Sequence, residues 1–190
     1  LTYYKQDGSF GALGHAVSDG DTGVQMSLSE GYIYETKIVS IQKGKTGVPG
    51  ELAGIIDYGE SHCMGSITEN SPLGIRGVLN DTAGELSGEF YEVAYKQDIE
   101  LGKAYIISEV SGERAEYEIE IESLDYSGDE ENKGILFKVT DERLLDLTGG
   151  IVQGMSGSPI IQNGKMIGAV THVFVSDASM GYGIFIEKML

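Results

Sequence analysis

The stretch that most constrains the fold is residues 115–122, where apolar and acidic side chains alternate strictly. Ala115, Tyr117, Ile119 and Ile121 fall on one face of an extended strand, and four glutamates fall on the other. Because the acidic face needs water, the strand belongs to a sheet with one buried and one solvated side. The segment therefore predicts an antiparallel sheet.

Similar strand-like runs recur along the chain, at residues 32–41, 104–110, 134–140, 158–175 and 181–189. In the run 158–175, Asn163-Gly164 lies between apolar segments and predicts a hairpin turn. The pattern predicts one helix, at 140–150, with Thr140 as its N-cap. Many short strands separated by turns predict a mostly β protein, a sandwich or a barrel. We expect the glutamate-rich region 85–135 to be an acidic insertion on that core.

Charge and composition exclude several classes of function. The 13 basic and 30 acidic residues give a net charge of −17, which repels nucleic acid and anionic membrane surfaces. Cys63 is the single cysteine, so the chain has no internal disulfide and no thiolate metal cluster. The three histidines are widely spaced, and H-E-x-x-H does not occur. The sequence predicts no metal and no cofactor.

Residues 154–159, GMSGSP, hold the best candidate for a nucleophile, Ser156. A serine hydroxyl reacts only when a base takes its proton and donors receive the oxyanion. The flanking glycines permit a sharp turn that aims the N–H groups of Gly154 and Ser156 at one point. The alternative interpretation is a glycine-rich turn between a helix and a hairpin. Ser158 and Cys63 are weaker candidates for a nucleophile.

Three histidines compete for the role of base. His15 follows FGALG, which predicts a glycine-lined strand end that exposes the imidazole. His62 lies in the turn-like segment GESHCMG and fits a surface position. His172 lies sixteen residues after Ser156, on the strand beyond the predicted hairpin, where a structural role is the alternative.

The serine loop resembles the G-[DN]-S-G-G-P loop of chymotrypsin-like serine peptidases, except that Met155 and Ser158 replace the usual residues. Together with the segment GALGH at 11–15, it resembles the SpoIVB (stage IV sporulation protein B) type of serine peptidase over essentially all 190 residues. The resemblance implies a chymotrypsin-like double β-barrel with short helices. It also implies that Ser156 is the nucleophile and His15 the base.

The resemblance points to Asp141 as the third member of a triad, with the N–H groups of Gly154 and Ser156 as the oxyanion hole. Asp141 lies only fifteen residues before Ser156, closer than the acid of chymotrypsin-like enzymes, and an aspartate at a helix start also fits a cap. In such folds the strand of His172 borders the substrate pocket, so His172 is expected to recognise a polar or acidic substrate side chain. The rival acids are Asp19, Asp21 and Asp57.

The resemblance further implies one peptidase domain, residues 1–190, cut from a longer membrane-anchored protein whose anchor and PDZ domain lie upstream. Such peptidases cleave themselves and a membrane-bound regulator between forespore and mother cell, and thereby activate a sigma factor in sporulation. Two alternatives stay open. One is a catalytically silent β-barrel that binds or scaffolds other proteins, and the other is an esterase with the same triad.

Overall fold

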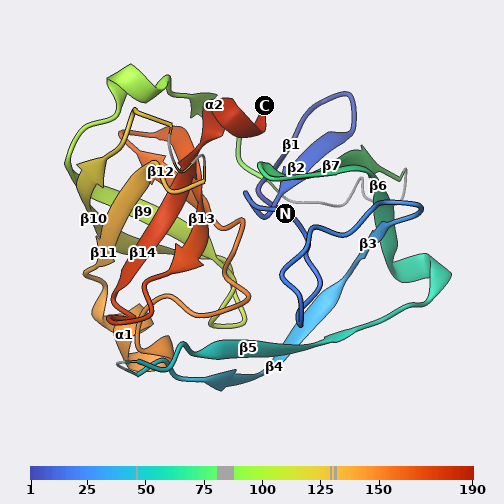
Figure 1. The fold of residues 1–190 in the computed structure, drawn as a ribbon, viewed down its shortest axis with the longest axis horizontal. Coiled ribbons are helices and arrows are strands. Elements are labelled where there is room, and N and C mark those ends of the chain that lie inside the picture. Colours follow the sequence, from blue (N-terminus) through green and yellow to red (C-terminus); the bar gives the residue numbers. More distant parts are fainter. Residues whose placement is uncertain (46, 81–87, 129, 131) are drawn as a thin grey trace.

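The structure is a computed structural model that describes residues 1–45, 47–80, 88–128, 130 and 132–190. It consists mostly of β-strands, arranged in two lobes that face each other (Figure 1). The N-terminal lobe is blue to green in the figure, and the C-terminal lobe runs from light green to red. A two-stranded arm runs along the lower edge between the lobes.

The N-terminal lobe is a five-stranded antiparallel sheet in the order β1-β2-β7-β6-β3. Its strands are β1 (Tyr3–Tyr4), β2 (Ser9–Ala12), β3 (Tyr32–Tyr34), β6 (Cys63–Ser71) and β7 (Gly74–Leu79). A short 3-10 helix, η1 (Glu60–His62), precedes β6. Phe10, Ala12 and Ile75 form a small core of their own, so this lobe is the less extensively packed of the two.

The arm consists of the antiparallel strands β4 (Thr36–Gln42) and β5 (Glu51–Ile56). At its far end it reaches the C-terminal lobe, where the Gly44 N–H donates to the Thr148 carbonyl at 2.8 Å. The N–H of Leu52 donates to the Gln153 carbonyl, also at 2.8 Å. The arm therefore ties the N-terminal lobe to the residues just before 154–159.

The C-terminal lobe is a closed barrel of six strands. Its strands are β9 (Gly102–Ser108), β10 (Ala115–Leu124), β11 (Ile135–Val139), β12 (Pro159–Gln162), β13 (Lys165–Val173) and β14 (Met180–Phe185). The pairing of β12 with both β9 and β13 closes the barrel. Outside it, β8 (Glu92–Val93) pairs in parallel with β13, and a 3-10 helix, η3 (Lys96–Asp98), leads into β9. The barrel and the facing sheet confirm the predicted mostly β, chymotrypsin-like class.

The strand predicted from the alternation in residues 115–122 is confirmed as part of β10. Tyr117, Ile119 and Ile121 point into the barrel core and are at most 2% exposed, while the glutamates lie on the outer face. The 163–164 turn is also confirmed, since Asn163 (φ 52°) and Gly164 (φ 75°) both adopt the positive φ that such a hairpin requires.

The acidic region 85–135 differs from expectation, although its residues 85–87, 129 and 131 lie outside the described part of the chain. Residues 102–124 are not an insertion, because β9 and β10 are two walls of the barrel itself. A barrel wall has a solvated outer face, and that face accommodates the glutamates.

The predicted helix is confirmed as α1 (Glu142–Thr148), which ends at Gly149 with φ 78°. Its N-cap is Asp141 and not Thr140: the Asp141 carboxylate accepts a hydrogen bond from the Arg143 N–H. The predicted strand 181–189 ends at residue 185, and α2 (Ile186–Met189) follows it. Within the described ranges, neither helix is long and apolar enough to cross a membrane.

Candidate active site

Residues 154–159 form the loop between α1 and β12, and their backbone makes the sharp turn expected of a nucleophile loop. Gly154 (φ 100°) and Gly157 (φ 86°) adopt left-handed conformations that residues with a Cβ disfavour. Between them, the Met155 side chain is buried in the core of the barrel and anchors the loop. Ser156 is thereby held half-buried at the edge of the C-terminal lobe.

The loop leaves two backbone donors free. Among the residues that the structure describes, no group accepts a hydrogen bond from the N–H of Gly154 or of Ser156. The N–H groups of Met155, Gly157 and Ser158, by contrast, all donate to backbone carbonyls. Free donors beside a nucleophile are what a developing oxyanion needs, and these two are the predicted pair.

His15 reaches this loop from the N-terminal lobe, at the end of β2. The chain turns there through Leu13 (φ 70°) and Gly14 (φ 76°). A Cβ built on Gly157 would lie 2.7 Å from the Leu13 backbone nitrogen, and one on Gly14 would lie 2.8 Å from Cγ2 of Thr171. The segment that carries His15 therefore packs directly against the segments that carry Ser156 and its neighbour strand β13.

The hydroxyl and the imidazole are close in the fold but are bonded to other groups. Ser156 Oγ donates to the Thr171 carbonyl at 3.1 Å, and His15 Nδ1 lies 2.9 Å from the Ala16 carbonyl. A carbonyl only accepts, so Nδ1 carries the proton and Nε2 has the free lone pair of a base. The described residues show no hydrogen bond between Ser156 and His15.

His172 lies beside His15, with the two ring centroids 5.5 Å apart and the planes tilted by 44°. Its Nδ1 atom is buried and has no hydrogen-bond partner among the described residues. Burial, followed by the positive charges available to His15 and Lys133, lowers the pKa of His172 below its usual value. The ring is therefore neutral near pH 7.

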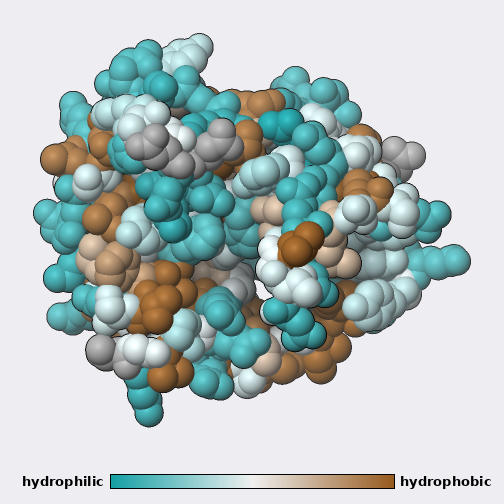
Figure 2. Space-filling model, viewed as in Figure 1, coloured by the Kyte–Doolittle hydropathy of each residue, from teal (hydrophilic) through white to brown (hydrophobic). Residues whose placement is uncertain are grey.

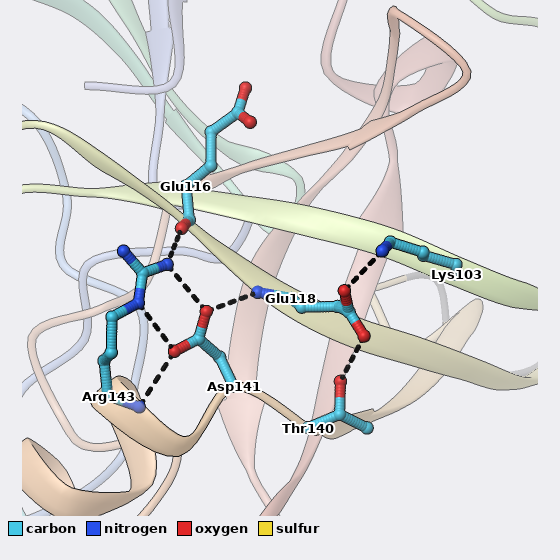
Figure 3. Close-up of polar contacts among 6 residues, drawn as sticks. All are labelled: Lys103, Glu116, Glu118, Thr140, Asp141 and Arg143. Carbon is cyan, nitrogen blue, oxygen red and sulfur yellow. Dashed lines mark hydrogen bonds and ion pairs between the residues drawn. The ribbon is translucent and has the colours of Figure 1, made fainter.

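Asp141 occupies a different environment (Figure 3). Its carboxylate binds the Arg143 guanidinium at 2.7 and 3.1 Å and accepts from the N–H groups of Arg143 and Glu118. The hydrogen bonds to Arg143 and the backbone lower the pKa of Asp141 to about 2. These bonds hold it at the start of α1, and none of those in the described ranges joins it to His15.

The other predicted candidates also have partners of their own or stand apart. The Asp19 carboxylate binds Thr22 within its own turn, and that of Asp57 lies 3.4 Å from Nε2 of His62. The exposed His62 donates from Nδ1 to Glu35 at 2.9 Å, in agreement with a surface position. The described bonds link no carboxylate, including that of Asp21, to His15.

A cavity of about 1090 Å³ lies between the lobes, and Gly154 and Ser156 form part of its wall. The opposite wall includes Tyr34 and Ile38 and reaches Leu52 of the arm. Figure 2 shows apolar side chains gathered along the lower edge of the molecule, over the arm. The loop 154–159 thus borders a partly apolar space large enough for several residues of a peptide.

The structure adds two residues that the sequence patterns did not indicate, Thr2 and Leu13. Thr2 is buried, and its Oγ1 donates to the Gly157 carbonyl at 2.8 Å. No motif marks Thr2, because its role depends on a contact across 155 residues of sequence. Leu13, with its positive φ, was also missed, although the adjacent glycine is a sign of the turn.

Comparison with models of protein families identifies the family of this chain. The sequence model of a family described as SpoIVB peptidase S55 matches residues 1–190, the whole chain. No curated protein matches it in sequence.

Proposed function

The chain belongs to the SpoIVB peptidase S55 family, and we propose that it is a serine endopeptidase in which Ser156 is the nucleophile and His15 the base. One observation carries the assignment of residues. The strand end that bears His15 and the turn that bears Ser156 come from different lobes and pack together through Leu13 and Gly157. The sequence places these two segments 141 residues apart, so their contact is a property of the fold.

The reaction follows the chemistry of an activated serine. Oγ of Ser156 attacks the carbonyl carbon of the scissile peptide bond, and its proton passes to Nε2 of His15. The C–N bond breaks, the departing amine takes that proton, and the acyl group remains on Oγ. A water molecule then gives a proton to Nε2 and attacks the ester, Oγ recovers that proton as the C–O bond breaks, and the product leaves as a carboxylic acid that ionises in water.

The N–H groups of Gly154 and Ser156 receive the negative charge that forms on the carbonyl oxygen in both steps. Loss of one such donor in an acyl-transfer enzyme slows catalysis by roughly 10²–10³-fold. Because both donors are backbone groups, their direction depends on the left-handed φ of Gly154. The observation that supports this role is that neither N–H has a partner among the described residues.

The resting arrangement requires a small change before reaction. The Ser156 hydroxyl must leave the Thr171 carbonyl and turn to His15, exchanging one neutral hydrogen bond for another. We expect a peptide bound in the cavity to favour this exchange, since it fills the space beside Ser156.

The proposed physiological role rests on the family. A SpoIVB-type peptidase is expected to act outside the cytoplasm, in the space between forespore and mother cell. Its proposed substrates are itself and a membrane-bound regulator, whose cleavage leads to sigma-factor activation in sporulation signalling. A segment outside residues 1–190 would supply the membrane anchor.

A fluorophosphonate probe tests the chemistry in one measurement. We expect a covalent adduct that peptide mapping places on Ser156, and we expect Ser156→Ala and His15→Ala to abolish it. Ser158→Ala is the matched control and should keep the adduct, since Ser158 lies in the same loop. An adduct on Ser158, or no adduct on any serine, would contradict the proposal and favour a silent binding domain.

A panel of peptide and ester substrates separates the remaining alternative. A peptidase cleaves an internal peptide bond, and the cleavage disappears in Ser156→Ala. Turnover of esters with no cleavage of any peptide bond would instead identify an esterase with the same nucleophile.

A further inference from the structure

Among the described residues, no side chain is hydrogen-bonded to His15, the proposed base. A histidine that accepts a proton works best when a second group holds the ring and stabilises its positive form. Asp141 is committed to Arg143 and to the start of α1. The Ala16 carbonyl, which now binds Nδ1 of His15, is adjacent in sequence and belongs to the same segment.

His172 is the side chain placed to meet this need. Its ring lies within the centroid separation at which aromatic rings make direct contact. It follows Thr171, whose carbonyl accepts from Ser156, so β13 brings it to nucleophile and base together. Its Nδ1 is a buried polar atom without a partner in the described part of the chain. Buried polar atoms rarely stay unsatisfied, and such an exception calls for a functional explanation.

We infer that His172 is a positioning residue that accepts a hydrogen bond from His15 and stabilises the protonated base during peptide-bond cleavage. This inference rests on the proposed function of Ser156 and His15. It is an alternative to the substrate-recognition role predicted for His172, and the two assign different contacts to the same side chain.

The inferred change consists of two exchanges of hydrogen bonds. Nδ1–H of His15 leaves the Ala16 carbonyl and binds the lone pair on Nδ1 of His172, and Nε2 of His15 turns toward Ser156. Ser156 in turn releases the Thr171 carbonyl. The number of hydrogen bonds stays the same, and Nδ1 of His172 gains a partner that it lacks among the described residues.

The charges around His172 favour a neutral ring, which can accept a hydrogen bond. Among the described residues, the ionisable groups that act on it are His15, Lys133 and Glu130. Lys133 is paired with Glu130 and lies over the ring of Tyr182, the residue opposite His172 on β14. Burial with these neighbours lowers the pKa of His172, so its ring stays neutral and keeps the lone pair. A neutral acceptor can stabilise an imidazolium on His15, whereas a charged ring would repel it.

The kinetic test compares His172→Phe, which keeps an aromatic ring without an acceptor, with His172→Asn, which restores one. We expect His172→Phe to lower kcat by roughly 10²-fold with little change in KM, less than the loss of a triad acid because the Ala16 carbonyl still fixes the tautomer. The acidic limb of the kcat/KM profile should move to lower pH than in the wild type. His172→Asn should recover part of both effects. His62→Phe is the matched control for a histidine outside the site.

A spectroscopic measurement keeps the test independent of activity. In the ¹⁵N-histidine-labelled protein treated with the fluorophosphonate, and in untreated protein at a pH that protonates His15 and leaves His172 neutral, we expect a scalar coupling across a hydrogen bond between the His15 and His172 nitrogens. The coupling should vanish in His172→Phe and persist in Asp141→Asn. An absent coupling in the wild type would overturn the inference, whether or not the protein cleaves peptides.

Two further kinetic outcomes would also overturn it. One is an altered preference for the substrate side chain in His172→Phe with an unchanged pH profile, which would restore the substrate-recognition role. The other is a greater loss of kcat in Asp141→Asn than in His172→Phe. Failure of the proposed function itself would be recognised separately, by peptide cleavage that survives in Ser156→Ala.

Discussion

Gly157→Ala probes the contact that brings the two lobes together at the active site. Gly157 has φ 86°, and a Cβ at this position would lie 2.7 Å from the backbone nitrogen of Leu13 and 3.1 Å from Oγ1 of Thr2. The nearest atom, the Leu13 nitrogen, belongs to the backbone, so it cannot move aside by a change of side-chain rotamer. The new methyl group must displace either the serine loop or the segment that leads to His15.

Gly164→Ala provides the matched control. Gly164 has a similar φ of 75°, and a Cβ there would meet nothing within 4 Å. The control therefore measures conformational strain alone, about 1–2 kcal/mol for a left-handed residue with a Cβ. Gly157→Ala adds the cost of overpacking, about 1–3 kcal/mol. We expect it to lower the free energy of unfolding by about 2–5 kcal/mol in total.

Urea unfolding followed by circular dichroism measures both variants, with the midpoint as the readout and the slope expected to stay constant. At urea-free conditions where Gly157→Ala is still folded, labelling of Ser156 by a fluorophosphonate should also be slower than in Gly164→Ala. Equal midpoints for the two variants would refute the close approach between Gly157 and Leu13, and with it the geometric basis of the site.

Three further substitutions test single contacts. Thr2→Val leaves the Gly157 carbonyl without its buried partner, so the free energy of unfolding should fall by about 1–3 kcal/mol and labelling of Ser156 should slow, while Thr2→Ser should behave as wild type. Asp141→Ala removes a helix cap and should lower the free energy of unfolding by about 0.5–2 kcal/mol. Because the pKa of Asp141 is lowered to about 2 in the folded state, the difference in stability between wild type and variant should shrink when urea unfolding is repeated between about pH 4 and about pH 2. A hydrogen bond to Glu35 raises the pKa of His62, so its stabilising effect is present below its unfolded pKa of about 6.5 and is lost as pH rises through the folded value. His62→Gln should therefore lower stability at about pH 5.5 and not at about pH 9, and equal effects at both would contradict the pairing.

The parts of the fold that could be predicted from the sequence depend on local patterns. The alternation in residues 115–122 predicts one solvated and one buried face, and β10 has both. Asn163-Gly164 has the two residues that most easily adopt positive φ in succession, and the hairpin forms there. The turn at GMSGSP likewise follows from glycines on either side of Ser156. In each case the physical cause lies within a few residues of the pattern.

The features that could not be predicted are determined by tertiary contacts. Thr140 and Asp141 are both good caps, and Asp141 is selected because its carboxylate also meets Glu118 N–H on β10. Excess acidic charge in 85–135 fits an insertion and a barrel wall equally well, since both are solvated. The interaction of Thr2 with Gly157 joins two ends of the chain, and no local pattern marks it.

The position of the proposed nucleophile and base on different lobes has a consequence for control of the proposed activity. Where the two lobes meet at the site, the contacts are tight and involve backbone: Gly157 against Leu13, Gly14 against Thr171, and the Thr2 hydroxyl on the Gly157 carbonyl. The contact of Gly157 with Leu13 joins backbone to backbone and has no rotamers with which to absorb a displacement, so a shift of one lobe passes directly to the Ser156–His15 geometry. Since both catalytic groups are bonded elsewhere in the resting structure, such a shift is also the simplest way to bring them together. We therefore expect substitutions in these contacts to change the rate of Ser156 labelling more than equally destabilising substitutions inside the barrel core, such as Ile119→Val.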